Sequence, residues 1–212
     1  MKIVCLSDTH TLHRKVKVPE GDILIHAGDI CHKGRSREVI EDFDQWLGDL
    51  PHTYKIVVAG NHDLLFETEP AATRALLTQA TYLEDESLTI EGIKIWGSPV
   101  TPYFLGMGFN RKRGAVIRQH WEKIPPDVDL LITHGPPRGI LDRTAIGIRA
   151  GCHDLAEYVA RIQPRLHLFG HIHERYGQVQ AANTLFVNAC IVNIFRRPVN
   201  APVVIDWQKL KG

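Results

Sequence analysis

Five short clusters of metal-ligating side chains each follow directly after an apolar run of the sequence. The clusters are Ser7-Asp8-Thr9-His10, Ala27-Gly28-Asp29, Gly60-Asn61-His62-Asp63, Thr133-His134-Gly135-Pro136-Pro137 and Gly170-His171-Ile172-His173. Carboxylate, amide and imidazole groups without thiolates suit Mn, Fe, Zn, Co or Ni better than softer metal ions. The sequence therefore predicts metal chemistry that uses oxygen and nitrogen ligands.

The number of candidate ligands predicts two metal ions rather than one. The candidates are Asp8, His10, Asp29, Asn61, His134, His171 and His173. A tetrahedral site uses about four ligands, so this set suits two ions that share a bridging carboxylate. Two ions roughly 3.5–4 Å apart can stabilise both the attacking and the leaving oxygen of a phosphoryl displacement. Two aspartates and a bridging hydroxide do not cancel the charge of two divalent ions, so the site favours an anionic phosphoester.

One histidine of the third cluster remains outside the ligand set. His62 can protonate a leaving alkoxide or stabilise charge in the transition state. We expect the adjacent Asp63 to hold the His62 imidazole in one tautomer, as carboxylates beside metal sites often do. Gly28, Gly60 and Gly170 precede the ligands. They are predicted to let the backbone turn sharply beneath the ions.

Basic side chains near the clusters are candidates for substrate contacts. Arg138 and Arg143 follow the His134 cluster, and a guanidinium there fits a nonbridging phosphate oxygen. Arg111 lies in a run of three basic residues, and the alternative for such a run is a solvated surface. His32 follows the Gly28-Asp29 cluster closely and is a candidate for contact with substrate.

Apolar runs that alternate with amphipathic stretches must position these clusters. Strands are predicted at 3–6, 23–27, 56–59, 130–133 and 166–169, each just before a cluster. The carboxyl ends of strands in an open α/β sheet form the ligand crevice, so all five clusters are expected at one edge. Helices are predicted at 36–50, 70–79, 114–123 and 155–162, and further strands at 82–83, 88–90, 93–96, 178–181, 185–187 and 203–207.

The order of these elements predicts one α/β domain that covers residues 1–212. Strands and helices alternate early in the chain and hairpins dominate late, which indicates layers built on mixed sheets. The irregular stretches 97–113 and 135–152 are expected to shape the substrate pocket, because long loops in a compact domain usually serve function.

Composition excludes several classes of protein. Hydrophobic residues make up 44% and charged residues 23%, which excludes disorder and collagen-like repeats. A formal net charge of +1 predicts no stable polynucleotide binding. The cysteines form no Cys-x-x-Cys pair, no apolar run is long enough to span a bilayer, and the first residues lack a signal-peptide pattern. We therefore expect a cytoplasmic protein that does not bind membranes.

The ordered set of motifs resembles the calcineurin-like metallophosphoesterase superfamily. The motifs are Asp-x-His, Gly-Asp, Gly-Asn-His-Asp, Thr-His-Gly and Gly-His-x-His, spread from Asp8 to His173. Trp96-Gly97-Ser98-Pro99, the run after Thr133, and Asn200-Ala201-Pro202 are similar to the small branch of metallophosphoesterase-domain-containing proteins. The resemblance implies a four-layer α/β/β/α sandwich in which two mixed β-sheets are flanked by helices.

The resemblance also implies how the ligands divide between two divalent ions. Asp8, His10, Asp29 and His173 would bind one ion, Asp29, Asn61, His134 and His171 would bind the other, and Asp29 would bridge them. His62 would assist departure of the leaving group. Some animal members carry glycine in place of the histidine found here as His171, so its presence implies two filled sites. We expect Mn²⁺, with Fe, Zn, Ni or Co as alternatives.

The resemblance implies hydrolysis of small phosphodiesters such as cyclic nucleotides, and we expect a metal-bridging hydroxide to attack phosphorus. The expected partner is accordingly a small phosphoester, with nucleotides among the candidates. The alternatives are a phosphomonoesterase or phosphoprotein phosphatase, a nuclease, and a module that binds a nucleotide or metal without turnover. The native metal pair, the choice between cyclic and linear diesters, and the oligomeric state stay open at the level of sequence.

Overall fold

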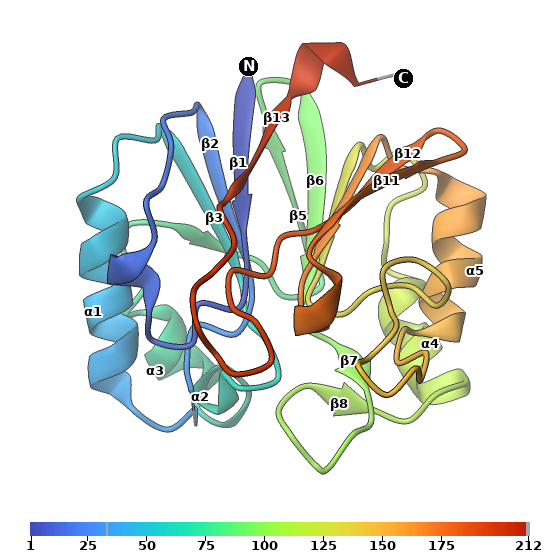
Figure 1. The fold of residues 1–212 in the computed structure, drawn as a ribbon, viewed down its shortest axis with the longest axis horizontal. Helices are drawn as coiled ribbons and strands as arrows, with labels where there is room; N and C mark the ends of the chain where they lie inside the picture. Colours follow the sequence, from blue (N-terminus) through green and yellow to red (C-terminus); the bar gives the residue numbers. More distant parts are fainter. Residues whose placement is uncertain (33, 211–212) are drawn as a thin grey trace.

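Two mixed β-sheets pack face to face, and helices cover their outer faces (Figure 1). The computed structural model describes residues 1–32 and 34–210. The first sheet has the order β13 (Val203–Asp206), β1 (Lys2–Leu6), β2 (Ile23–Ala27), β3 (Tyr54–Val58), β4 (Thr81–Tyr82). The second has the order β11 (Gly177–Ala181), β12 (Thr184–Asn188), β10 (Leu166–Phe169), β9 (Leu130–Thr133), β6 (Ile93–Ser98), β5 (Glu86–Ile90).

Parallel strands form the centre of each sheet, and an antiparallel strand lies at one edge of the first sheet and at each edge of the second. In the first sheet β1, β2, β3 and β4 run parallel, whereas β13 pairs antiparallel with β1. In the second sheet β6, β9, β10 and β12 run parallel, whereas β5 and β11 are antiparallel. A separate two-stranded pair joins β7 (Thr101–Pro102) to β8 (Asn110–Arg111).

The helices divide between the two sheets. Figure 1 shows α1 (Arg37–Gly48), α2 (Leu64–Thr68) and α3 (Pro70–Arg74) on the side of the first sheet, and α4 (Ala115–Trp121) and α5 (His153–Ile162) on the side of the second. Three short 3₁₀ helices are also found among the described residues: η1 (His13–Lys15), η2 (His173–Arg175) and η3 (Trp207–Lys209). The predicted four-layer α/β/β/α sandwich is confirmed.

Alternation along the strands builds the two kinds of interface. In β1, Ile3 and Cys5 lie in the core between the sheets, whereas Val4 and Leu6 pack toward α1. This is the period-2 pattern of a strand that is buried on both faces. On the other side, a third core cluster joins the outer face of β6, β9 and β10 to helices α4 and α5.

Some short elements differ from those predicted. Helix α1 begins after Ser36, whose side chain accepts a hydrogen bond from Val39 N and caps the helix as expected. The helix predicted at 70–79 is shorter in the structure, where α3 ends at Arg74. Helix α2 and the pair β7 and β8 were not predicted, since elements of so few residues are too short to show periodicity. Among the described residues, no helix is long and apolar enough to cross a membrane.

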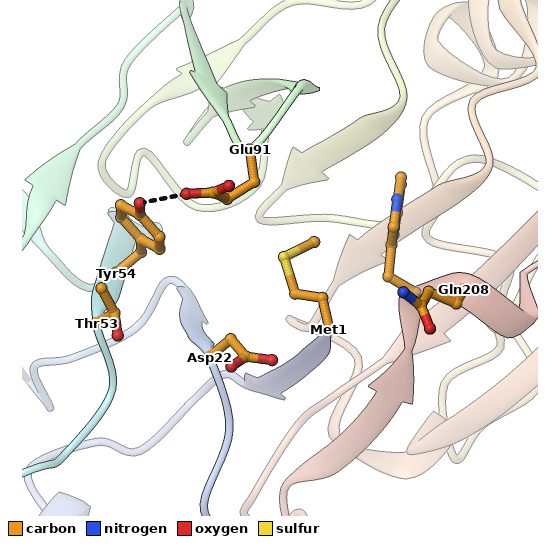
Figure 2. Close-up of a pocket in the computed structure, with 7 residues that line it drawn as sticks. Met1, Asp22, Thr53, Tyr54, Glu91 and Gln208 are labelled. Atoms are coloured by element: carbon orange, nitrogen blue, oxygen red, sulfur yellow. Dashed lines mark hydrogen bonds between the residues drawn. The ribbon is translucent and has the colours of Figure 1, made fainter.

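Met1 and the 3₁₀ helix η3 lie at the same end of the sandwich (Figure 1). A pocket of about 560 Å³ opens at this end. Met1, Asp22 and Thr53, which directly precede β1, β2 and β3, contribute to its lining. Figure 2 shows Tyr54 in the same pocket, where its hydroxyl donates a 2.8 Å hydrogen bond to Glu91. The pocket therefore lies at the amino ends of the parallel strands, away from the five clusters.

Candidate metal centre

All seven predicted ligands follow the carboxyl ends of parallel strands. Asp8 and His10 follow β1, Asp29 follows β2, Asn61 follows β3, His134 follows β9, and His171 and His173 follow β10. A chain of short contacts joins the two sheets. His173 Nε2 lies 3.4 Å from Asp8 Oδ1 and 3.3 Å from His10 Nε2. The ring centroids of His134 and His171 lie 5.0 Å apart. The sandwich thus brings all seven predicted ligands together.

Asp29 lies between two groups of imidazoles. Its Oδ2 is 3.7 Å from His10 Nε2, and its Oδ1 is 3.4 Å from His134 Nε2. Asp29, His10 and His62 form one group of donor atoms within 4.8 Å of one another, and Asp29, His134 and His171 form another. A carboxylate whose two oxygens face different imidazoles has the arrangement of a bridging ligand.

Hydrogen bonds to backbone carbonyls fix the tautomers of two of these histidines. His134 Nδ1 donates to Ala27 O at 2.9 Å, and His10 Nδ1 donates to Cys31 O at 2.9 Å. A carbonyl only accepts, so in each neutral ring the lone pair is on Nε2. Both Nε2 atoms therefore point a lone pair into the cluster, which is the orientation that a metal ligand needs.

The atoms around His134 Nε2 require a cation at this position. Asn61 Oδ1 lies 3.0 Å away and Asp29 Oδ1 lies 3.4 Å away, and both are acceptors. Burial disfavours the charged His134 ring, but the carboxylates of Asp29 and Asp8 outweigh burial and raise its pKa to about 9. A proton satisfies the converging acceptors in the absence of metal, and a divalent ion held by the same atoms would replace that proton. The donor set therefore fits a metal ion.

The buried aspartates of the cluster are held in their charged form. Burial opposes ionisation of Asp8, but a hydrogen bond with His173 and the charge of His134 lower the pKa of Asp8 overall. Asp29 is buried as well, and His134 and His10 keep its pKa well below the usual range. Burial and the neighbouring His134 lower the pKa of His171 to about 4, so its ring is neutral at pH 7. Charged carboxylates and a neutral imidazole are the protonation states that bind metal ions.

Unusual backbone conformations concentrate at the cluster. Asp8, His10, Asp29 and His171 have φ values of 55°, 43°, 59° and 68°. These values lie in the left-handed region that side chains other than glycine rarely adopt. Strained residues of this kind gather at functional sites, where the surrounding structure holds them in place. Four of the seven predicted ligands therefore share a feature that their sequence motifs alone did not reveal.

Two of the three glycines that precede ligands serve a purpose other than the predicted sharp turn. Gly28 has φ +102° and makes the turn. A Cβ at Gly170 would lie 2.0 Å from Asp8 Oδ2, and a Cβ at Gly60 would lie 2.3 Å from Asp29 Oδ1. These two glycines are needed because a carboxylate of the cluster lies against their backbone.

His62 borders the cluster and is held by backbone groups. Its Nδ1 donates to the carbonyl of His32 at 2.8 Å, and its backbone N–H donates to Asp29 Oδ1 at 2.8 Å. Its ring lies 4.9 Å from the ring of His10, centroid to centroid. The bond to His32 fixes the proton on Nδ1, so Nε2 is the nitrogen that remains for proton transfer.

The prediction that Asp63 holds the His62 tautomer is wrong, because the His32 carbonyl occupies that place. The Asp63 carboxylate instead accepts hydrogen bonds from three backbone N–H groups: Ile30 at 3.2 Å, Cys31 at 2.8 Å and Gly60 at 2.8 Å. Burial and the nearby Asp29 raise the pKa of Asp63 to about 7, although these backbone bonds oppose the rise. Asp63 thereby joins the loops after β2 and β3, which carry Asp29 and Asn61.

Two of the predicted substrate arginines, Arg111 and Arg138, have side-chain partners outside the cluster, and Arg143 is placed by its backbone. Arg111 pairs with Glu67 at 2.8 Å. Arg138 donates to the carbonyl of Arg149 at 3.3 Å, and Arg143 forms an isolated β-bridge with Arg149. Within residues 1–32 and 34–210, no hydrogen bond or ion pair joins these three side chains to the predicted ligands.

His32 is the predicted substrate residue that the structure brings to the cluster. Its carbonyl holds His62, and its ring centroid lies 6.3 Å from that of His10. Arg196, which the sequence did not indicate, lies against the same ring, with Nη1 2.9 Å from both ring nitrogens. The only sequence signal for Arg196 is the Arg196-Arg197 pair, and nothing in that pair shows its neighbour 164 residues away.

The long loop 97–113 also reaches the cluster. Gly108 N donates to the carbonyl of Asn61 at 3.0 Å, and Asn61 Nδ2 donates to Met107 Sδ at 3.2 Å. In the second long loop, Ala145 N donates to Glu174 Oε1 at 2.7 Å, next to His173. Both loops that the sequence predicted as pocket-forming thus contact residues at or beside the cluster.

Comparison with known proteins agrees with this geometry. The calcineurin-like phosphoesterase family matches residues 1–175. The chain is 44% identical to metallophosphoesterase domain-containing protein 1 of Homo sapiens, over 97% of this chain and 70% of that protein. It is 41% identical to a UPF0046 protein of Caenorhabditis elegans, over 96% of this chain and 74% of that one.

A solved structure shares the fold at much lower sequence identity. Phosphopantetheinyl hydrolase of Mycobacterium tuberculosis superposes with a TM-score of 0.63 at 15% identity, over 100% of this chain and 98% of that one. The family match, the close relatives and the converging donor set agree. The chain belongs to the calcineurin-like phosphoesterases and is a metal-dependent phosphoric ester hydrolase.

Proposed function

We propose that this chain is a two-metal phosphodiesterase that hydrolyses small phosphodiesters, with cyclic nucleotides among its substrates. The position of Asp29 carries the proposal, because its two oxygens face donor groups from the two different sheets. Asp8, His10, Asp29 and His173 would hold one divalent ion, and Asp29, Asn61, His134 and His171 the other. Mn²⁺ is the ion that we favour for these oxygen and nitrogen donors.

The metal ions and His62 would have different roles in the reaction. Two divalent ions supply positive charge that stabilises the transferring phosphoryl group, and they lower the pKa of bound water. His62 lies beside this centre with its Nδ1 fixed by His32 O, and its Nε2, once it has taken up a proton, would donate that proton to the leaving oxygen. An alkoxide leaving group needs this proton, which supports an ester of an ordinary alcohol as substrate.

The test compares a diester with its monoester analogue. Purified protein would be stripped with chelator, refilled with Mn²⁺, and assayed on bis(p-nitrophenyl) phosphate and p-nitrophenyl phosphate. We expect Mn²⁺-dependent cleavage of the diester in wild type and loss of that activity in Asp29→Asn. Asp127→Asn is the matched control, because Asp127 pairs with Lys94 at the surface and should keep full activity when it is changed.

The other outcomes decide between classes of function. A preference for the monoester would make the chain a phosphomonoesterase. Metal-dependent binding of a nucleotide without cleavage of either ester, across Mn²⁺, Fe²⁺, Ni²⁺ and Zn²⁺, would make it a binding module. Activity that survives Asp29→Asn would show that a contaminant, or a different site, does the chemistry.

A further inference from the structure

The connection between β12 and β13 forms a rigid turn beside the cluster. We call residues 193–197 the 193–197 turn. Asn193 Oδ1 accepts hydrogen bonds from Phe195 N at 3.0 Å and Arg197 N at 3.1 Å, and Asn193 N donates to Arg197 O at 3.0 Å. These three bonds hold the backbone of the turn in one conformation.

The strand end that carries Asp8 anchors the same connection. Ile191 N donates to Ser7 O at 2.9 Å, and Ser7 N donates to Ala189 O at 3.0 Å. The connection consequently lies at the end of the sandwich opposite Met1 and η3, as Figure 1 shows. Its position relative to Asp8 is set by backbone bonds rather than by flexible side chains.

Arg196 is held toward His32 by this turn. The backbone of Arg196 has a φ of 54°, in the left-handed region. Residues other than glycine rarely adopt that region unless the surrounding structure imposes it. Arg196 Nη1 lies 2.9 Å from both Nδ1 and Nε2 of His32. An atom equally close to both ring nitrogens lies over the face of the ring, since in the ring plane it would collide with the carbon between them. Arg196 Nη1 therefore lies over the face of the His32 ring, at the border of the cluster.

The charge of Arg196 is not cancelled by a carboxylate. Several other arginines form ion pairs with aspartate or glutamate, namely Arg14, Arg37, Arg74, Arg111, Arg118 and Arg149. Across residues 1–32 and 34–210, no carboxylate pairs with Arg196. The side-chain hydrogen bonds described for Arg196 use Nη1 alone, whereas a guanidinium carries five N–H donors.

We propose that Arg196 positions the substrate by donating hydrogen bonds to a phosphoryl oxygen of the bound ester. The proposal rests on the proposed function for the identity of the ester. The geometry by itself supports the binding of an anionic group. A planar guanidinium fork fits a phosphate group, and such charge-assisted bonds are roughly twice as strong as neutral ones. The rigid turn keeps the guanidinium against the imidazole of His32, whose ring centroid lies 6.3 Å from that of His10. Arg196 thus takes the role that the sequence suggested for Arg111, Arg138 and Arg143.

The first test measures binding of inorganic phosphate, which does not depend on turnover. Mn²⁺-loaded protein would be titrated with phosphate, and the dissociation constant taken from paramagnetic relaxation of the ³¹P signal. We expect Arg196→Gln to raise the dissociation constant about ten-fold or more, the effect of losing a hydrogen bond to a charged group. Arg197→Gln is the matched control, because Arg197 is exposed and contributes backbone groups to the turn.

The second test separates positioning from damage to the site. In Arg196→Gln the KM for the activated diester should rise about ten-fold, with kcat within about three-fold of wild type and metal content unchanged. Arg196→Lys should recover part of the loss, because it restores the charge but not the fork. A fall in kcat with unchanged phosphate affinity would overturn the proposal, since Arg196 would then act through His32 and His62.

The two tests also distinguish failure of this inference from failure of the proposed function. Equal phosphate affinity in wild type, Arg196→Gln and Arg197→Gln would overturn the inference even if the wild-type protein hydrolyses diesters. Phosphate binding that depends on Arg196 in a protein without esterase activity would keep the inference and overturn the proposed function.

Discussion

At the scale of single residues, a backbone carbonyl orients the His62 ring, where we expected a carboxylate to do so. The proton of His62 is fixed on Nδ1 by His32 O, and no charged group is needed to orient the ring. Asp63 is used instead to tie three backbone N–H groups together. Loss of the His62 side chain would therefore remove a group that takes part in the reaction. Loss of the Asp63 side chain would instead disturb the geometry of the loops after β2 and β3.

His62→Ala is expected to lower kcat while the metal content stays unchanged. A positioned general acid contributes typically about 10²–10⁴-fold, so a loss of this size should appear in kcat for an unactivated alkyl diester. The loss should be smaller for bis(p-nitrophenyl) phosphate, because its p-nitrophenolate group leaves without a proton. Metal content by atomic absorption should equal that of wild type. A variant that loses metal together with activity would show that His62 is a ligand.

The residues that form the site could be predicted from the sequence, whereas the residues that contact them could not. The ligands follow apolar runs that form parallel strands, so their convergence is a consequence of strand polarity. The contact between Arg196 and His32 depends on where a turn between two distant strands is placed. No local pattern encodes such a contact, and the arginines nearest to the motifs in sequence proved to have partners elsewhere.

At the scale of elements, one partly buried carboxylate joins helix α4 to the first strands of the second sheet. Asp85 accepts hydrogen bonds from Ser98 Oγ at 2.7 Å, His120 Nδ1 at 2.6 Å and Lys123 Nζ at 2.8 Å. Burial opposes its ionisation, but these three bonds outweigh burial and lower the pKa of Asp85. The backbone of Asp85 has a φ of 55°. Asparagine tolerates this conformation as well as aspartate does, so Asp85→Asn removes the charge without backbone strain.

Asp85→Asn should lower the free energy of unfolding by about 1–3 kcal/mol at pH 7. A lowered pKa means that the contribution of Asp85 is complete above its unfolded pKa of about 3.9 and is lost as pH falls through the folded value. The gap between wild type and variant should accordingly be constant above about pH 5 and should narrow as the pH falls from about 5 toward 3. Urea unfolding across this range checks the prediction. A gap that is constant with pH would mean that lost packing, and not lost charge, causes the change.

The longer elements could be predicted because their periodicity extends over several turns or pleats. Helix α1 and the central strands agree with the predicted ranges to within about two residues, which is the usual uncertainty of element ends. The short elements α2, β7 and β8 depend on contacts with the rest of the molecule. Arg111 of β8, for example, is held by Glu67 of α2, and neither element shows a pattern of its own.

At the scale of the whole molecule, the cluster joins the two sheets, so metal binding is linked to folding. The first sheet contributes the residues after β1, β2 and β3, and the second contributes those after β9 and β10. An ion held by residues from both sheets binds only where the sheets are packed together. Metal should therefore stabilise the fold by mass action.

Chelation is expected to lower the melting temperature. At a free metal concentration of about 100 times the dissociation constant, the stabilisation is about 2.7 kcal/mol, which corresponds to a shift of about 5–10 °C for a domain of this size. Differential scanning fluorimetry with EDTA and then with added Mn²⁺ measures this shift. Asp29→Asn should show a much smaller one. Equal melting temperatures with and without metal would show that the donor set does not bind ions in the folded state.

The hydrogen bond from Trp207 N to Met1 O, at 2.9 Å, has a consequence for how the chain can be rearranged. It brings the start of β1 next to the end of β13, far from the cluster (Figure 1). A short linker could therefore connect the segment after β13 to Met1, and new ends could be opened at the exposed Ala182-Asn183 turn between β11 and β12. The permuted polypeptide would contain the same strands in a different order along the chain, and the cluster would assemble unchanged.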